Sequence, residues 1–250
     1  MNAYLLSHTG LGDNITMISA IRFLGKFYQK IYFLCKDCHQ ENVRLFFNDS
    51  VTVIPFDKNH EFLQCYQIIN KASAKDDILI CGYHKRYIAS RITNSKLLEY
   101  KKNNEHTTPY SFIKDFYDDA GLDLYIYYYY FDISSTELSC KLYEQVKNYK
   151  IAFFHTQASN IEINLEHKMS TFAQNSEYIV ICANKNIYKD TDEKHVIASQ
   201  YVNIKIAYYI DIIKSANVIH VVDSCFSCIV SPLHYTNSLK ASECVVHSRV

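Results

Sequence analysis

The 250-residue sequence has no tryptophan, only five glycines and three prolines, and no net charge, because 26 basic side chains balance 26 acidic ones. Zero net charge argues against binding of nucleic acid by bulk electrostatics, which needs an uncompensated basic surface. No apolar run approaches the roughly 20 residues that span a bilayer, and the first residues lack the basic and apolar regions of a signal peptide. With 48% hydrophobic residues, the chain can bury a sizeable core. We therefore expect a cytoplasmic globular protein without a membrane span.

The scarcity of glycine makes its placement informative. Two of the five glycines, Gly10 and Gly12, lie together near the N-terminus, so turns elsewhere must use Asn, Asp and Ser. The 22 tyrosines are what an AT-rich genome would encode, and the run at 127–130 needs no functional explanation. The nine cysteines are scattered, several of them inside apolar runs, and we expect reduced thiols rather than a disulfide framework.

Short β-branched or aromatic runs alternate with amphipathic segments, a pattern typical of an α/β protein with parallel sheets. In a first series we predict strands at 3–7, 31–35, 51–55, 78–81 and 124–131, and helices at 14–28, 41–47, 61–72, 109–120 and 135–149. In a second series we predict strands at 151–155, 178–182, 218–222 and 244–247, and helices at 165–174, 193–199, 207–216 and 225–233. The sequence thus predicts two Rossmann-like domains with mainly parallel sheets, at residues 1–140 and 150–250, with a junction near 140–150.

The first candidate site is segment 8–14, between the first predicted strand and the first predicted helix. Ligands bind at the carboxyl ends of strands in open α/β sheets, and glycines there let the backbone approach a ligand closely. A dinucleotide fingerprint would need a third glycine where Ile15 stands, which disfavours a nicotinamide dehydrogenase. A structural alternative makes the two glycines a tight turn and Asp13 the N-cap of the helix.

The second candidate site is segment 223–228, directly after the apolar strand predicted at 218–222. It places a carboxylate and two hydroxyls at a strand end and a helix start: Asp223, Ser224 and Ser227. The structural alternative is that one of these side chains only caps a buried helix. Each predicted domain thus has one polar strand-to-helix corner that could face a cleft between the domains.

The order of these two motifs resembles the ADP-heptose:lipopolysaccharide heptosyltransferases and their relatives. In that family a Gly-Asp pair precedes the first helix, as residues 12–13 do here, and an Asp-Ser/Thr-Gly-x-Ser/Thr-His motif follows an apolar strand, as 223–228 does. Cys225 stands at the glycine of that motif, and Cys228 stands at its histidine. The resemblance covers both ends of the chain and the order of elements between them.

The resemblance implies a GT-B architecture, in which two Rossmann-like domains face each other across a cleft. It implies transfer of a sugar from a nucleotide sugar to a glycan or other hydroxyl acceptor, with inversion and without an essential metal or other cofactor. The N-terminal domain would bind the acceptor, the C-terminal domain the donor, and Asp13 would be the general base. The residues expected to bind substrates are Gly10, Gly12, Asn14, His155, Thr156, Lys185, Asp223, Ser224 and Ser227.

Other interpretations stay open at this point. A catalytically silent nucleotide-sugar or glycan-binding protein would have the same fold, and a carboxylate of Asp13 turned back onto the amide of residue 15 or 16 would favour it. A sugar-nucleotide epimerase would need further carboxylates and a histidine that we cannot identify. The Cys-x-x-Cys pairs at 35–38 and 225–228 could supply thiolates to zinc, but they belong to separate halves of the chain.

Overall fold

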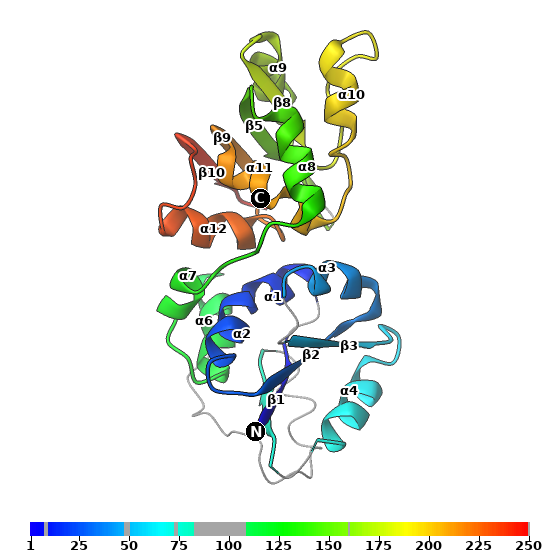
Figure 1. Ribbon diagram of the computed structural model, residues 1–250, viewed down its shortest axis with the longest axis vertical. Helices are drawn as coiled ribbons and strands as arrows, with labels where there is room; N and C mark the ends of the chain where they lie inside the picture. Colours follow the sequence, from blue (N-terminus) through cyan, green and yellow to red (C-terminus); the bar gives the residue numbers. More distant parts are fainter. Residues whose placement is uncertain (8–9, 48–50, 73–74, 83–108, 160, 250) are drawn as a thin grey trace. The chain divides into compact units, whose positions relative to one another are not determined.

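The computed structural model describes residues 1–7, 10–47, 51–72, 75–82, 109–159 and 161–249. The chain divides into two compact units, Met1–Asp132 and Ile133–Val250, and each unit has its own sheet (Figure 1). The division falls before the predicted junction because helix α8 (Glu137–Val146) packs within the second unit. There the buried Tyr201 hydroxyl donates to the Leu142 carbonyl oxygen at 2.6 Å.

The first unit contains a four-stranded parallel sheet in the order β3-β2-β1-β4. Its strands are β1 (Asn2–Leu6), β2 (Lys30–Lys36), β3 (Val51–Phe56) and β4 (Asp77–Ile80). Its helices are α1 (Leu11–Thr16), α2 (Ile18–Leu24), the 3-10 helix η1 (Asp37–His39), α3 (Gln40–Arg44), α4 (Glu61–Asn70), α6 (Pro109–Asp119) and α7 (Tyr125–Tyr129). These strands confirm the first four predicted from the sequence, to within one or two residues.

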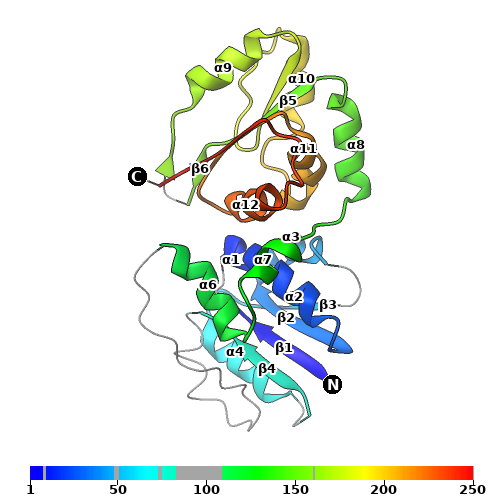
Figure 2. The ribbon, with the colours of Figure 1, turned by 90° about the vertical axis from the view of Figure 1, so that its left-hand side faces the viewer.

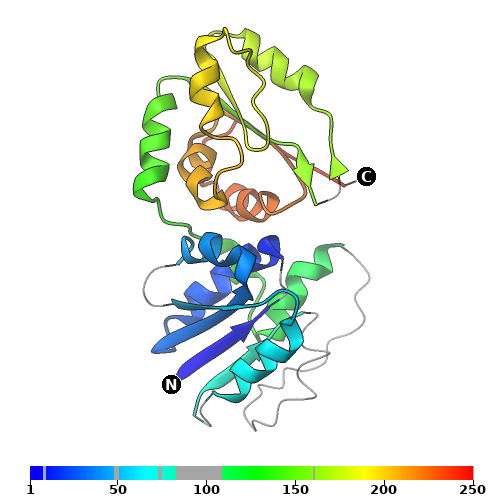
Figure 3. The same ribbon diagram turned by 90° about the vertical axis from the view of Figure 1, so that its right-hand side faces the viewer.

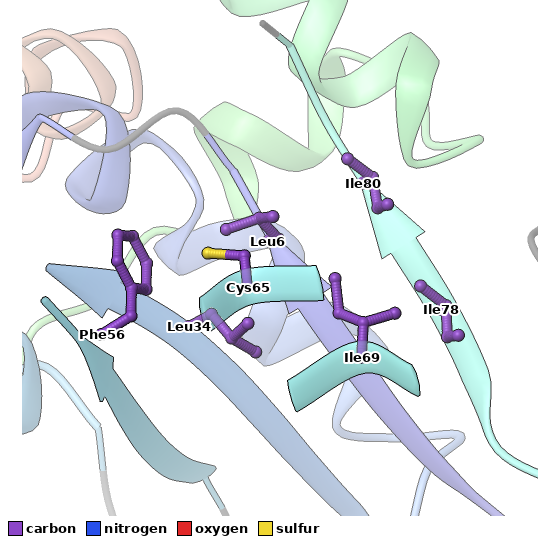
Figure 4. Close-up of a cluster of buried hydrophobic side chains, with 7 residues drawn as sticks. All are labelled: Leu6, Leu34, Phe56, Cys65, Ile69, Ile78 and Ile80. Carbon is purple, nitrogen blue, oxygen red and sulfur yellow. The ribbon is translucent and has the colours of Figure 1, made fainter. Parts of the chain in front are cut away.

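A hydrophobic cluster lies between this sheet and helix α4, which runs across one face of the strands (Figure 3). Figure 4 shows its members, which are Leu6, Leu34, Phe56, Cys65, Ile69, Ile78 and Ile80. Full burial of such a side chain stabilises a fold by about 1.5–3 kcal/mol. Strand β4, buried from Ile78 to Ile80, is a continuous apolar run, as expected for a strand covered on both faces, whereas only Val53 and Phe56 of the edge strand β3 are buried.

The second unit contains a parallel sheet in the order β10-β9-β5-β8. Its strands are β5 (Lys150–His155), β8 (Tyr178–Cys182), β9 (Val218–Val222) and β10 (Glu243–His247), with a short antiparallel pair, β6 (Gln157–Ala158) and β7 (Ile161–Glu162), that the sequence did not predict. Its other helices are α9 (Glu166–Gln174), α10 (Glu193–Ser199), the 3-10 helix η3 (Ile206–Tyr209), α11 (Ile210–Ser215) and α12 (Ser227–Tyr235). In Figure 2, α8 and α11 lie on one side of β5 and α9 lies on the other.

Two elements of the first unit differ from the prediction. The strand predicted at 124–131 is wrong, because these residues form helix α7, which packs on helix α2. The buried Ser19 hydroxyl donates to the Tyr127 carbonyl oxygen at 2.8 Å, so this backbone is bonded to a helix rather than to a sheet. The helix predicted at 14–28 is also wrong in its bounds, since it begins at Leu11 and is interrupted at Met17, between α1 and α2.

Both sheets reverse their strand order at the strand that comes first in the unit. Strand β1 lies between β2 and β4, and strand β5 lies between β8 and β9. Such reversal points are where open α/β sheets bind ligands, at the carboxyl ends of the strands. The fold therefore places residues 10–14, which come after β1, and segment 223–228, which follows β9, at the two favoured positions. In the described part of the chain, no helix is both long and apolar enough to cross a membrane.

Candidate functional site

The first corner is organised by a contact between Gly10 and Asp13. Gly10 is the N-cap of α1, and its N–H donates to Asp13 Oδ2 at 2.9 Å. Asp13 is thus the third residue of the helix, and the structural alternative that makes it the N-cap does not describe this corner. A Cβ atom on residue 10 would lie 2.8 Å from Asp13 Oδ2, so a larger residue there would displace this carboxylate from the Gly10 N–H. Residues 8 and 9 of the predicted segment lie outside the described residues.

Asn14 is the unusual residue of this corner. It is fully buried, and neither its Oδ1 nor its Nδ2 has a hydrogen-bond partner within the described ranges. A buried polar group without a partner costs about 1–3 kcal/mol. The sequence predicted Asn14 as a substrate-binding residue, and among the described residues nothing uses the hydrogen-bonding capacity of its amide. Gly12 has a local role, since its carbonyl oxygen accepts from Thr16 Oγ1 at 3.1 Å.

We expect Asn14→Leu to raise the free energy of unfolding by about 1–3 kcal/mol, because it removes two unpaired buried polar atoms at similar volume. Urea denaturation measures the change. Asn184→Leu is the matched control and should destabilise the protein, because Asn184 Oδ1 accepts from the Thr156 N–H at 3.0 Å. Destabilisation by Asn14→Leu comparable to that of the control would contradict the prediction.

The second corner joins three of the predicted residues through Ser227. Its hydroxyl lies 2.9 Å from Asp223 Oδ1 and 2.6 Å from the Ser224 carbonyl oxygen, and it accepts from the Ser224 N–H at 3.0 Å. The Ser224 hydroxyl accepts from the Phe226 N–H at 3.3 Å and lies 3.2 Å from His155 Nδ1. His155 reaches it because β5 pairs with β9. Sequence positions 155 and 223–227 therefore meet in one hydrogen-bonded network.

Burial sets the protonation states at this corner. It lowers the pKa of His155 to about 4, so the imidazole is neutral near pH 7 and offers a hydrogen bond rather than a charge. Burial also raises the pKa of the Cys225 thiol to about 11, so the residue that replaces the motif glycine stays protonated. A protonated thiol is a poor nucleophile, and this corner is suited to binding rather than to covalent catalysis.

Thr156 and Lys185 have partners that the sequence did not reveal. The Asn184 Nδ2 donates to Thr156 Oγ1 at 2.9 Å, so this asparagine, which follows β8, anchors the loop after β5. Lys185 Nζ lies 3.2 Å from both Glu162 Oε1 and Glu166 Oε1. The predicted diphosphate contact is thus a lysine whose charge two carboxylates already offset. The only sequence signal for these partners is their order in the chain, since Asn184 follows β8, and Glu162 and Glu166 follow β5.

Arg249, near the C-terminus, is a further residue that the sequence did not predict. Its Nε donates to the Asp223 carbonyl oxygen and lies 3.8 Å from Asp223 Oδ2. Over the described residues, no group of three or more His, Cys, Asp or Glu side chains is arranged to hold a metal ion. The two Cys-x-x-Cys pairs lie in different units.

No protein-family model and no curated protein matches the sequence. Solved structures do resemble it. Escherichia coli ADP-heptose LPS heptosyltransferase II has a TM-score of 0.60 and 12% identity, over 93% of this chain and 82% of that one. A family 9 glycosyltransferase from Veillonella parvula gives 0.58 and 12%, over 98% and 85%. The E. coli heptosyltransferase WaaC, solved with ADP, gives 0.55 and 10%, over 93% and 84%.

At these identities the likeness concerns the fold. The likeness covers nearly the whole of this chain, which has two units with parallel sheets as the sequence predicted. The chain therefore has the fold of the ADP-heptose heptosyltransferases and of glycosyltransferase family 9, which confirms the resemblance inferred from residues 12–13 and 223–228.

Proposed function

We propose that this protein is an inverting, metal-independent glycosyltransferase that moves a sugar from a nucleotide sugar to a hydroxyl acceptor. The observation that carries the proposal is the position of the two motifs at the strand-order reversals of a heptosyltransferase fold. Because one of the similar structures was solved with ADP, ADP-sugars are the first donors to test. The proposal includes the GT-B arrangement, in which an acceptor held by the first unit meets a donor held by the second.

Asp13 is the proposed general base. As the acceptor oxygen attacks the anomeric carbon, the carboxylate takes the proton of the acceptor hydroxyl, and the bond from that carbon to the nucleoside diphosphate breaks on the opposite face. The Gly10 N–H bonded to Oδ2 fixes the orientation of the carboxylate at the start of α1.

The second unit is the proposed donor site. The neutral His155 and the hydroxyls of Thr156 and Ser224 supply hydrogen bonds to the diphosphate, and Lys185 supplies positive charge. These groups would stabilise the negative charge that develops on the leaving nucleoside diphosphate. The carboxylates of Glu162 and Glu166 must move aside from Lys185 before it can pair with phosphate.

The direct test is a thermal-shift screen of the full chain against ADP, UDP, GDP, CDP and their common sugar conjugates. A ligand at 100 times its Kd stabilises the protein by about 2.7 kcal/mol. We expect stabilisation by one base only, and release of the corresponding nucleoside diphosphate in the presence of an acceptor. If none of these nucleotides stabilises the protein, the proposed donor site is refuted.

The double variant Ser224→Ala/Ser227→Ala should bind that nucleotide about ten- to a hundredfold more weakly, since two hydrogen-bonding groups worth about 0.5–1.5 kcal/mol each are lost. Isothermal calorimetry measures the affinity. Ser242→Ala is the control, because its hydroxyl donates to the Asn217 carbonyl oxygen at 3.2 Å elsewhere in the same unit. A folded double variant with wild-type affinity would place the nucleotide elsewhere.

A catalytically silent binding protein is the second candidate. Two observations favour it, namely the side chain of Cys225 at the position of a motif glycine and the two carboxylates on Lys185. Such a protein would be stabilised by a nucleotide sugar without consuming it. Release of nucleoside diphosphate over time therefore separates the two candidates.

A further inference from the structure

A polar cluster outside the candidate site lies under helix α9, on one face of the second sheet. Its centre is His220 of β9, which is completely buried and stacks on Phe154 with ring centroids 5.3 Å apart. His220 Nε2 lies 3.0 Å from Glu243 Oε1, and its Nδ1 lies 3.0 Å from His247 Nε2. Both partners belong to β10, and Lys168 Nζ of α9 lies 2.6 Å from Glu243 Oε1. None of these side chains has a role in the proposed function.

The contacts fix where the protons are. The Lys168 ammonium, through its hydrogen bond, lowers the pKa of Glu243, so this carboxylate is ionised and can only accept. His220 must then carry its proton on Nε2 and donate it to Glu243. Its Nδ1 is left as an acceptor, and His247 must donate to it from Nε2. With both rings neutral, one arrangement of protons satisfies every contact.

This cluster is connected to the second corner through the backbone of β10. The carbonyl oxygen of His247 accepts from the Asp223 N–H at 2.8 Å. Two residues later, Arg249 Nε donates to the Asp223 carbonyl oxygen. Asp223 Oδ1 in turn accepts from the Ser227 hydroxyl, which shapes the rest of the corner. The end of β10 thus fixes the backbone of Asp223 through hydrogen bonds, and the contact between the two histidine side chains fixes the end of β10 against β9.

We propose that His220 and His247 are positioning residues that keep β10, and with it the Asp223–Ser227 corner, in place, and that uptake of two protons by this pair releases the corner. The proposal rests on the proposed function only in assigning nucleotide binding to that corner. One added proton leaves the pair bonded, because an imidazolium can donate to a neutral imidazole. A second proton sets two N–H groups against each other at 3.0 Å.

The charged groups around the pair determine the pH of release. Burial and the nearby Lys168 lower the pKa of both histidines, and Glu243 opposes this at His220. The ordinary pKa of histidine is 6.5, and the histidines of the bonded pair have a lower pKa. The bonded pair is therefore stable above about pH 6.5 and loses stability relative to the released form as the pH falls below that value. The two rings interact directly, so they titrate as a pair.

Amide hydrogen exchange of the full chain from pH 7.5 to 5.0, followed by NMR and corrected for the intrinsic exchange rate, tests the proposal without any nucleotide. The equilibrium constant for opening at the Asp223 amide should increase as the pH falls, by up to about tenfold per pH unit for each extra proton that the released form binds. Between pH 7.5 and 5.0 we expect an increase of at least about tenfold. His155, with a pKa of about 4, titrates below this range in the folded protein. Constant protection of the Asp223 amide would overturn the proposal.

Three variants sharpen the test. His220→Phe keeps a ring on Phe154 but removes both hydrogen bonds, so the Asp223 amide should exchange fast at every pH. His247→Gln keeps an N–H in place of Nε2 but cannot be protonated, so protection at pH 7 should persist and the acid response should fall. His167→Gln removes an exposed imidazole from α9 and should behave as wild type. Wild-type acid responses in both of the first two variants would overturn the proposal.

Calorimetry with ADP at pH 7.0 and 5.5 connects the pair to the donor site. We expect the affinity of the wild type to fall at the lower pH and that of His247→Gln to fall less. If ADP binds at neither pH, the proposed donor site fails, whereas the exchange data still decide whether the histidine pair holds β10. If ADP binds equally at both pH values while the Asp223 amide opens in acid, the link to binding is refuted.

Discussion

Asp13→Asn is expected to reduce sugar transfer by at least about a hundredfold, because a general base typically contributes 10²- to 10⁴-fold in rate. In the wild type the Gly10 N–H donates to Asp13 Oδ2 at 2.9 Å. The side-chain oxygen of asparagine can accept the same hydrogen bond, so helix α1 should begin at the same residue. Nucleotide binding by the second unit should not change. Release of nucleoside diphosphate in the presence of acceptor measures the rate, and calorimetry measures the affinity.

The matched control is Asp192→Asn, which alters a carboxylate that caps a helix in the second unit. Asp192 is the N-cap of α10 and accepts from the Lys194 N–H at 2.8 Å. We expect wild-type turnover from it. Retained turnover in Asp13→Asn would exclude this residue as the base. Loss of folding in Asp13→Asn alone would show that the Gly10–Asp13 contact serves only to start the helix.

His155→Asn should make the protein less sensitive to acid, by about 2–3 kcal/mol between pH 7.5 and 4.5. Burial holds the pKa of His155 near 4, below its ordinary value of 6.5, so the unfolded chain takes up this proton first as the pH falls. Stability is therefore lost from pH 6.5 downwards until the folded imidazole also titrates. Urea denaturation at the two pH values gives the difference for wild type and variant.

Asparagine suits this test because its side-chain amide can meet the Ser224 hydroxyl, now 3.2 Å from His155 Nδ1, and does not titrate. The variant loses the ring that lies 4.5 Å from Phe226, so a lower stability at pH 7.5 is expected and the pH difference is the informative quantity. His167→Gln, on the exposed surface of α9, should leave the difference unchanged. An equally large loss in acid for His155→Asn would contradict the neutral buried imidazole.

The sheets could be predicted because strands that are buried on both faces consist almost entirely of apolar residues. All residues of β9 are buried, and so are all residues of β5 except Lys150; both strands are apolar runs apart from His220 in β9 and His155 at the end of β5. Helix α7 could not be predicted in this way. Its tyrosines suit a strand by propensity, and its conformation is decided by packing on α2 and by the bond from Ser19, both of which involve residues more than a hundred positions away.

In the candidate site, too, one part could be predicted from the sequence and another could not. Parallel strands bring their carboxyl ends to one edge, so the proximity of His155 and Ser224 follows from strand order together with the polar residues after each strand. The partners of individual side chains do not follow. The contact of Asn184 with Thr156 and the absence of a partner for Asn14 in the described structure depend on loop paths and on packing, which no short motif specifies.

The ion pairs of Lys185 have a kinetic consequence for any diphosphate bound at the second corner. Glu162 Oε1 and Glu166 Oε1 both lie 3.2 Å from Lys185 Nζ, so a diphosphate that pairs with this lysine would replace these contacts and its departure would restore them. The departing anion leaves behind a neutralised lysine rather than a bare charge, which lowers the free-energy cost of dissociation. Under the proposed function we therefore expect rapid exchange of the product nucleotide, with a residence time shorter than an unpaired lysine would give.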